Sequence, residues 1–285
     1  MRTLVFGGAG MLGRAVVGEA RRRGWPALGL SREQADLRDP ARLVAAADAF
    51  RPQLVVNCAA FTKVDACETE RQLALAVNGA AVANAAAAAA HARAALLQVS
   101  SDYVFDGVAG VPYAEDAATG PLSVYGESKL LGERQALAYG RALVVRMSWL
   151  FGPGGPNFVA TMVRAIDAGR QPLRVVDDQV GCPTYTRFAA RALLELGAGG
   201  ERGVVHYRNR EPVSWCGFAR EIAAAWRRGV AVEPITTAAA GRPARRPAYS
   251  VLAVERFESA LGRAVEPWSA GLLEYLDELR SGGVA

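Results

Sequence analysis

The run GGAGMLG at residues 7–13 constrains the fold more than any other part of the sequence. It follows an apolar, strand-like segment at residues 3–6 and precedes a helical pattern over residues 14–23. Glycines between a strand and a helix let the chain turn tightly and let the backbone approach a pyrophosphate, which the free N–H groups of the helix N-terminus can bind. The spacing is G-x-x-G-x-x-G rather than G-x-G-x-x-G, so a plain tight turn is the alternative. Its place directly after an N-terminal strand favours a dinucleotide-binding turn.

Short apolar segments alternate with helical patterns through the first half of the chain. The predicted strands lie at residues 3–6, 27–30, 54–56, 96–99 and 142–149, and the predicted helices at 14–23, 40–50, 69–92 and from residue 125. Such βαβ alternation is typical of an α/β protein with a doubly wound, Rossmann-type parallel sheet.

The order of elements changes beyond residue 150. Predicted strands there lie at residues 173–176 and 204–207, and predicted helices at 158–169, 184–197, 214–228 and 267–280. We expect a dinucleotide-binding domain over residues 1–150 and a smaller mixed α/β substrate-binding region over residues 151–285. The helix at about 184–197 could pack back on the first domain.

The run YGESK at residues 125–129 places a tyrosine and a lysine four residues apart at the start of a predicted helix. Residues at i and i+4 share one helical face, so both side chains can point at one reacting centre. The spacing also arises by chance, as an exposed pair on a helix. Only Lys63 and Lys129 are lysines among the 33 basic residues, and a lysine shifts in pKa when buried in a way that a guanidinium does not copy. Tyr125 and Lys129 are therefore a candidate catalytic pair.

The second predicted strand ends at Ser31 and Arg32. An acidic residue at this place would hold the ribose 2′-hydroxyl of NAD, whereas an arginine suits the 2′-phosphate of NADP. Arg32 thus favours NADPH, with NADH possible. The alternative is a solvated loop arginine in a chain rich in arginine.

Composition narrows the classes of protein that fit. The cysteines at 58, 67, 182 and 216 lack C-x-x-C spacing, which argues against a zinc site and fits reduced thiols. The N-terminus enters a strand without the pattern of a signal peptide. No apolar run approaches the ~20 residues of a membrane span, and the alanine run at 85–90 is too short. We expect a cytoplasmic protein that does not insert into membranes.

The net charge of +5 does not indicate a nucleic-acid partner, because the arginines are dispersed apart from the tracts at 21–23 and 242–246. His91 and His206 are too few and too isolated for a metal site or a Ser-His-Asp triad. No metal ligands are predicted, and a requirement for Mg²⁺ stays open.

Several segments, in the same order along the chain, resemble the extended short-chain dehydrogenase/reductase superfamily and, more closely, its dTDP-4-dehydrorhamnose reductase family. They are GGAGMLG at 7–13, VVNCAAFTKVDACE at 55–68, VSSDYVFDG at 99–107, PLSVYGESKLLGE at 121–133, VVRMSWLFGPGGPNFV at 144–159, VVDDQVGCPTYT at 175–186 and RRPAYSVL at 245–252. The resemblance covers nearly the whole chain.

The resemblance implies roles for individual positions. The catalytic hydroxyl, tyrosine and lysine of the family fall on Ser101, Tyr125 and Lys129. The positions expected at the cofactor are Gly7, Gly10, Met11, Leu12, Gly13, Arg32, Asp36, Leu37, Ala60, Phe61, Thr62, Val99, Tyr125 and Lys129. Those expected at the sugar nucleotide are Ser101, Asp102 and Trp149. The family usually has threonine at 101, lysine at 66 and often glutamine at 11, where this chain has serine, alanine and methionine; the serine keeps a hydroxyl.

The activity implied by the resemblance is reduction of the C4 keto group of dTDP-4-dehydro-β-L-rhamnose to dTDP-β-L-rhamnose, with hydride from NADPH or NADH. Tyr125 is expected to donate a proton to the carbonyl oxygen, and Ser101 to hydrogen-bond that oxygen. Lys129 is expected to lower the Tyr125 pKa, about 10 for a free phenol, and to hold the nicotinamide ribose.

Alternatives share these residues. One is a ketoreductase or epimerase for a different nucleotide deoxysugar. A dehydratase is disfavoured because no glutamate follows Asp102. Another is a catalytically silent, NADP-binding regulatory subunit. Both a monomer and a homodimer are compatible with the sequence.

Overall fold

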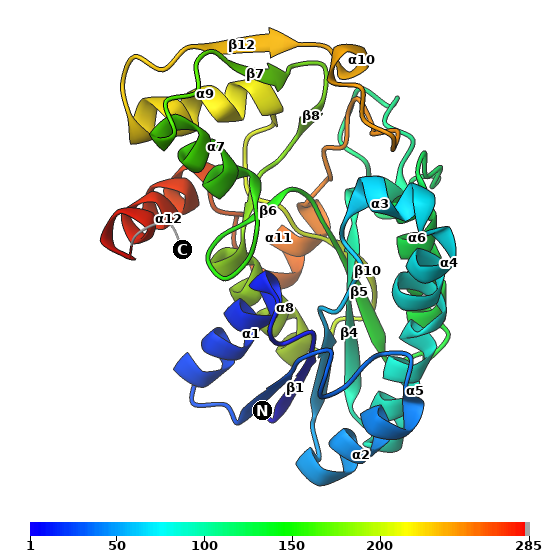
Figure 1. Ribbon diagram of the computed structural model, residues 1–285. Coiled ribbons are helices and arrows are strands. Elements are labelled where there is room, and N and C mark those ends of the chain that lie inside the picture. The colour runs from blue at the N-terminus through cyan, green and yellow to red at the C-terminus, as the bar shows by residue number, and fades with distance from the viewer. Residues whose placement is uncertain (283–285) are drawn as a thin grey trace.

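A six-stranded parallel sheet forms the centre of the computed structural model, which describes residues 1–282 (Figure 1). Its strands, in spatial order, are β10 (Gly203–His206), β5 (Ala142–Met147), β4 (Ala95–Ser101), β3 (Leu54–Asn57), β1 (Thr3–Phe6) and β2 (Ala27–Leu30). The chain passes from β1 to β2 on one side and then returns to place β3 on the other side. This reversal is the topological switch point at which doubly wound sheets bind their ligands.

Helices cover both faces of the sheet because successive strand side chains point to opposite faces. In β1, Val5 packs under α1 (Met11–Arg22), α8 (Thr186–Gly199) and α11 (Glu255–Leu261). Leu4 and Phe6 of the same strand pack under α2 (Pro40–Phe50), α5 (Val82–His91) and α6 (Val124–Leu137). The α/β, Rossmann-type fold predicted from the alternation of strands and helices is confirmed.

The alanine-rich segment predicted as one helix over 69–92 is divided into several. Helix α3 (Val64–Thr69) ends where the segment begins, and the segment itself contains α4 (Arg71–Ala74), a π-helical turn η1 (Leu75–Ala80) and α5. The amide of Asn78 lies in the π turn. It accepts a 2.7 Å bond from the Phe61 N–H and donates to the Phe61 carbonyl and to Ser128 Oγ, both at 3.0 Å. The π turn thus fastens the segment after β3 to α6, a use of π-bulges common near functional sites.

One helical run, Arg71–His91, is long and apolar enough by length and composition to cross a membrane. This differs from the expectation that no segment approaches that length. Half of its most apolar window is buried inside the fold, where Ala85, Ala88 and Ala89 are fully covered. Helix α5 contacts β3 and β4, so the apolar composition of this run is that of a helix in the protein core.

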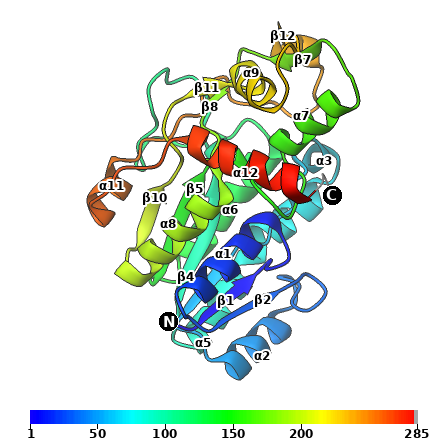
Figure 2. The ribbon, with the colours of Figure 1, turned by 90° about the vertical axis from the view of Figure 1, so that its left-hand side faces the viewer.

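A smaller lobe lies beyond the carboxyl ends of the strands (Figure 1, Figure 2). Helices α7 (Phe158–Asp167), α9 (Trp215–Trp226) and α12 (Trp268–Gly282) share one apolar core. The lobe also holds three strand pairs and a short helix: β7 (Leu173–Val176) with β12 (Val232–Ile235), β6 (Leu150–Phe151) with β9 (Thr184–Tyr185), β8 (Val180–Gly181) with β11 (Val213–Ser214), and α10 (Thr237–Ala240).

Two elements that follow residue 150 belong to the larger body. The strand expected within the mixed region is β10, which pairs in parallel with β5 at the edge of the main sheet; burial of Val205 and Tyr207 in the main core holds it there. Helix α8 lies along α1 in both views (Figure 1, Figure 2). A domain boundary at residue 150 would therefore separate β10 and α8 from the larger body to which they belong.

The fifth strand also ends earlier than predicted. β5 stops at Met147, and Trp149 takes a left-handed backbone conformation with φ of 47° before the chain enters β6. This reversal directs the Trp149 side chain away from the sheet and toward the smaller lobe, where its ring stacks on that of Trp215.

Candidate active site

The glycine turn leaves the N-terminus of α1 open to a phosphate group. Gly10 precedes the helix and has no side chain with which to bond its first N–H groups. Gly7 has φ of 74°, and a Cβ at Gly13 would lie 2.2 Å from the Gly7 carbonyl oxygen. The turn and helix can approach this closely only without side chains, and the exposed N–H groups suit a dinucleotide pyrophosphate.

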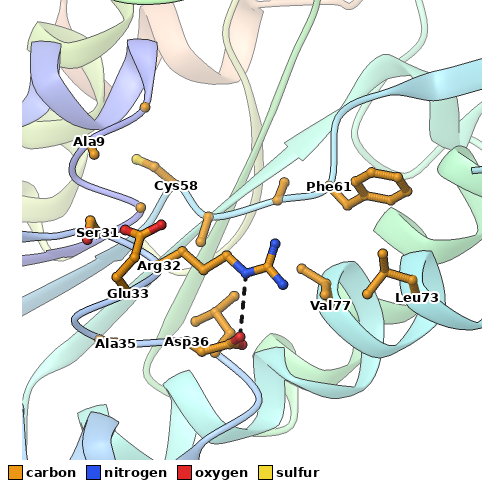
Figure 3. Close-up of a pocket in the computed structure, with 15 residues that line it drawn as sticks. Ala9, Ser31, Arg32, Glu33, Ala35, Asp36, Cys58, Phe61, Leu73 and Val77 are labelled. Carbon is orange, nitrogen blue, oxygen red and sulfur yellow. Dashed lines mark hydrogen bonds and ion pairs between the residues drawn. The ribbon is translucent and has the colours of Figure 1, made fainter. Parts of the chain in front are cut away.

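A cavity lies between the glycine turn, the end of β2 and the segment after β3 (Figure 3). Several predicted cofactor residues line it: Gly7, Gly10, Arg32, Asp36, Leu37, Ala60 and Phe61. Arg32 extends across the cavity, with its Nε 3.5 Å from Asp36 Oδ2. Arg38 holds the same carboxylate more tightly, with Nη2 at 2.6 Å from Oδ2, and its hydrogen bond keeps the Asp36 pKa well below the ordinary value. Most of the Arg32 side chain is exposed, at 69%, so an anion can reach its guanidinium.

A second cavity adjoins the first along the carboxyl edge of the sheet. Both have Ala9, Gly10, Cys58 and Ala60 in their walls. The second cavity is lined by the remaining predicted positions except Asp102: Met11, Leu12, Gly13, Thr62, Val99, Ser101, Tyr125, Lys129 and Trp149. The predicted cofactor and sugar sites are thus adjacent in space, although their residues come from distant parts of the chain.

Tyr125 lies in the first turn of α6, which begins where Ser123 Oγ accepts a 3.2 Å bond from the Gly126 N–H. Its ring packs edge-on against Tyr103, with centroids 5.5 Å apart. Burial raises the Tyr125 pKa, the Asp102 charge adds to the rise, and a hydrogen bond with Ser101 opposes it. The expected lowering of this pKa by Lys129 is therefore not found.

Lys129 follows one turn later and is buried, with 4% of its surface exposed. Its Nζ donates a 2.6 Å hydrogen bond to the Val99 carbonyl oxygen. Burial lowers the Lys129 pKa to about 8, while the charge of Glu133 works in the opposite direction. The ammonium thus points at the strand end beside the cavity, and its charge is sensitive to pH near neutrality.

Ser101 is the last residue of β4 and lies next to Asp102, which opens the short 3-10 helix η2 (Asp102–Val104). Ser101 Oγ donates a 2.9 Å bond to Asp102 Oδ1 and accepts a 3.2 Å bond from the Tyr103 N–H. Asp102 is 1% exposed. Ser101 lines the second cavity, whereas Asp102, also expected at the sugar nucleotide, does not.

Trp149 forms a wall of the second cavity. Its ring stacks on Trp215 of α9, with centroids 3.5 Å apart and planes 8° from parallel. A Cβ at Gly181 would lie 2.5 Å from the Trp149 ring, so the glycine makes room for the indole. The stack joins the smaller lobe to the end of β5 at the edge of the cavity.

Sequence reasoning missed several residues that shape the site. Glu133, two turns after Tyr125, is 2% exposed and pairs with Arg146 of β5 at 2.7 Å. The Ser100 hydroxyl donates a 2.5 Å bond to the same carboxylate. A glutamate eight residues after Tyr125, on the same helical face, was a usable signal. The contacts of Trp215 and Asn78 span long stretches of the chain, and no local pattern marked them.

Within the part of the chain that the structure describes, no group of three or more His, Cys, Asp and Glu side chains is placed to hold a metal ion. The arrangement instead provides a phenol, an ammonium and a hydroxyl at one cavity, beside a groove suited to a dinucleotide. These groups can hydrogen-bond and protonate a carbonyl oxygen.

Comparisons with known proteins agree with this geometry. A family model described as the RmlD substrate binding domain matches residues 1–281. A dTDP-4-dehydrorhamnose reductase of Streptomyces griseus is 43% identical over 281 residues, which cover 96% of this chain and 92% of that protein.

Solved structures are similar over their whole length. The crystal structure of a dTDP-4-dehydrorhamnose reductase of Clostridium acetobutylicum has a TM-score of 0.94 and 36% identity, covering 98% of this chain and 100% of that one. That of Bacillus anthracis str. Ames, in complex with NADP, has a TM-score of 0.93 and 31% identity, covering 97% and 99%. The predicted resemblance is thereby confirmed. The chain belongs to the RmlD substrate binding domain family, together with these dTDP-4-dehydrorhamnose reductases.

Proposed function

We propose that this chain catalyses the NADPH-dependent reduction of the C4 keto group of dTDP-4-dehydro-β-L-rhamnose to dTDP-β-L-rhamnose. The reductases to which it is similar are named for reduction of dTDP-4-dehydrorhamnose. The observation that carries the proposal is the placement of Ser101, Tyr125 and Lys129 in one cavity that adjoins the groove of the glycine turn.

The groove fits a dinucleotide. Gly7, Gly10 and Gly13 would receive its pyrophosphate at the bare N-terminus of α1. Asp36, Leu37 and Phe61 would surround the adenosine, and Arg32 would meet a 2′-phosphate, which supports NADPH over NADH. NADPH bound in this way supplies the hydride that reduces the carbonyl carbon.

Tyr125 would supply the proton that the reduced oxygen needs. Charge grows on that oxygen as the carbonyl carbon is reduced, and a donor already in place lowers the barrier. Burial keeps the Tyr125 pKa raised, so the phenol holds its proton until the reaction begins. Lys129, charged below a pKa of about 8, would stabilise the phenolate that forms.

The remaining residues would hold the sugar nucleotide. Ser101 would hydrogen-bond the C4 oxygen beside Tyr125, and the Trp149 ring would cover the sugar from the side of the smaller lobe. In this proposal residues 1–150, with β10 and α8, bind the cofactor, and most of residues 151–285 binds the substrate.

The direct experiment follows NADPH oxidation with a panel of dTDP-4-keto-6-deoxy sugars. The proposal predicts that dTDP-4-dehydrorhamnose has the highest kcat/KM. A preference for a different keto sugar would make the protein a ketoreductase of another deoxysugar, and interconversion of sugars without net NADPH oxidation would make it an epimerase. Cofactor binding without turnover of any sugar would indicate a silent subunit.

A further inference from the structure

We propose that Asp102 sets the direction of the Ser101 hydrogen bond, so that Ser101 can donate to the keto oxygen only while Asp102 carries a proton. This inference rests on the proposed function and gives Asp102 a positioning role, exerted through Ser101. It also provides the enzyme with an intrinsic dependence on pH that Tyr125 and Lys129 do not explain.

The argument begins with the number of bonds that a hydroxyl can make. A serine hydroxyl has one donor proton and two acceptor lone pairs. In this structure Ser101 Oγ donates to Asp102 Oδ1 over 2.9 Å, and one of its lone pairs accepts from the Tyr103 N–H over 3.2 Å. What remains is one lone pair, an acceptor that the neighbouring Tyr125 hydroxyl can use. A carbonyl oxygen is also an acceptor, so Ser101 in this state cannot stabilise it.

A proton on Asp102 reverses this arrangement. The acid O–H then donates to Ser101 Oγ, whose two lone pairs are filled by Asp102 and by the Tyr103 N–H. The Ser101 O–H no longer donates to Asp102 and can turn toward the cavity, which Ser101 lines. It can then donate to the keto oxygen together with Tyr125. The proton on Asp102 stays in place throughout, because Tyr125 supplies the one that the product keeps.

The surroundings of Asp102 favour its neutral form. Its side chain is almost completely buried, and Oδ2 has no hydrogen-bond partner of standard geometry among residues 1–282. An ionised carboxylate buried with one oxygen unbonded is costly, whereas a neutral acid is less so.

The neighbouring groups add no compensating charge. Those that face Asp102 are Ser101 and Tyr103 beside it, Tyr125 from α6, Cys182 between β8 and β9, and Ser250 from the C-terminal segment. None of these is a cation. Arg246 acts on Tyr103 and is itself bonded to Asp65 at 3.0 Å, and Arg208 acts on Cys182. Burial raises the Asp102 pKa to about 6, and the nearby hydroxyls of Ser250 and Ser101 oppose this rise.

The consequence is a loss of turnover as the pH rises. Above the Asp102 pKa the fraction of molecules with a free Ser101 donor falls about tenfold per pH unit. This falling limb of the pH–rate profile reflects Asp102. It lies at lower pH than the limb expected from loss of charge on Lys129, whose pKa is about 8. The two limbs are separable by substitution.

The experiment measures kcat from about pH 5 to about pH 9 for the wild type, Asp102→Asn, Ser101→Ala and the double variant. An asparagine amide donates to Ser101 at every pH, so Asp102→Asn should lack the lower limb and retain the upper one. Ser101→Ala should lack the lower limb as well. The double variant should have the same pH profile of kcat as Ser101→Ala alone. Asp106→Asn is the matched control: this carboxylate lies in the following loop, bonds to Tyr113 at 2.6 Å and has a lowered pKa, so the variant should keep the wild-type profile.

An unchanged lower limb in Asp102→Asn would overturn the inference. Absence of turnover by the wild type would overturn the proposed function instead, and a second measurement keeps the two apart. Infrared difference spectra of the free protein, wild type minus Asp102→Asn, should contain a protonated-carboxyl C=O band that disappears with a midpoint near the Asp102 pKa. Disappearance at the pH of an exposed aspartate would also contradict the inference.

Discussion

The ammonium of Lys129 is joined to the backbone carbonyl of Val99 by a 2.6 Å hydrogen bond. Val99 lies in the strand that ends at Ser101, whereas Lys129 lies on the helix that carries Tyr125. One turn later, Glu133 accepts a 2.5 Å bond from Ser100. These two side chains fix the helix to the strand end, and thereby fix the proposed proton donor relative to the proposed hydroxyl.

Replacing Tyr125 with phenylalanine should remove nearly all reductase turnover, with kcat reduced by at least ~10²-fold. The ring packing against Tyr103 survives the change, so NADPH should bind with wild-type affinity. Stopped-flow NADPH oxidation and cofactor fluorescence titration measure the two quantities. Near-normal turnover in this variant would rule out Tyr125 as the proton donor.

Replacing Arg32 with alanine should lower the ratio of kcat/KM for NADPH over NADH by about tenfold or more, because a charged hydrogen bond to a phosphate is lost. Arg38→Ala is the matched control, since Arg38 bonds the same Asp36 carboxylate but does not line the cavity. Its ratio should stay at the wild-type value. An equal drop in both variants would assign the effect to Asp36 rather than to a phosphate contact.

Glu133→Gln should destabilise the protein by about 3–5 kcal/mol, because the buried Arg146 loses the carboxylate that neutralises it. Glu127→Gln, on the same helix, breaks an ion pair with Arg71 whose side chains are half exposed, and should cost less than about 1 kcal/mol. Urea unfolding gives both free energies. Equal costs would show that the Glu133–Arg146 pair is not a structural link of the site.

Asp102→Asn should stabilise the fold at neutral and higher pH but not in acid. The folded protein holds the Asp102 proton up to about pH 6, whereas the unfolded chain releases it near 3.8. Wild-type stability therefore falls as the pH rises through this window, and the variant avoids a cost of at most about 3 kcal/mol. Urea unfolding at about pH 4 and about pH 8 measures it. An equal effect at the two pH values would argue against a raised Asp102 pKa.

The parts of the fold that the sequence predicted well are those set by local signals. The second strand was predicted at 27–30 and is found there. Helix α2 begins at Pro40, as expected, with Asp39 accepting a 3.2 Å bond from the Arg42 N–H. The glycine turn could be predicted equally well, because its conformation depends on the residues of the turn itself.

Features that depend on distant contacts were not predictable in this way. The π turn in the alanine-rich segment holds Asn78, which bonds to Phe61 and Ser128, and both residues lie far from it in the sequence. The strand at 203–206 lies in the main sheet because β5 offers it an unpaired edge.

The electrostatics of the site were the hardest feature to predict from the sequence. A spacing shows that Tyr125 and Lys129 share a helical face, but it does not show that the ammonium turns to the Val99 carbonyl. Nor does it show that burial raises the tyrosine pKa. Both depend on what surrounds the side chains, which only the folded chain defines.

The proposed reaction is tested most directly by following a labelled hydride into the product. NADPH that carries deuterium at the transferable position is mixed with dTDP-4-dehydrorhamnose and the purified protein, and the sugar nucleotide is identified by NMR. The account predicts dTDP-β-L-rhamnose with deuterium at C4, formed in equal amount to the NADPH consumed. A product with the opposite configuration at C4, deuterium at any other carbon, or recovery of the keto sugar with NADPH intact would contradict it.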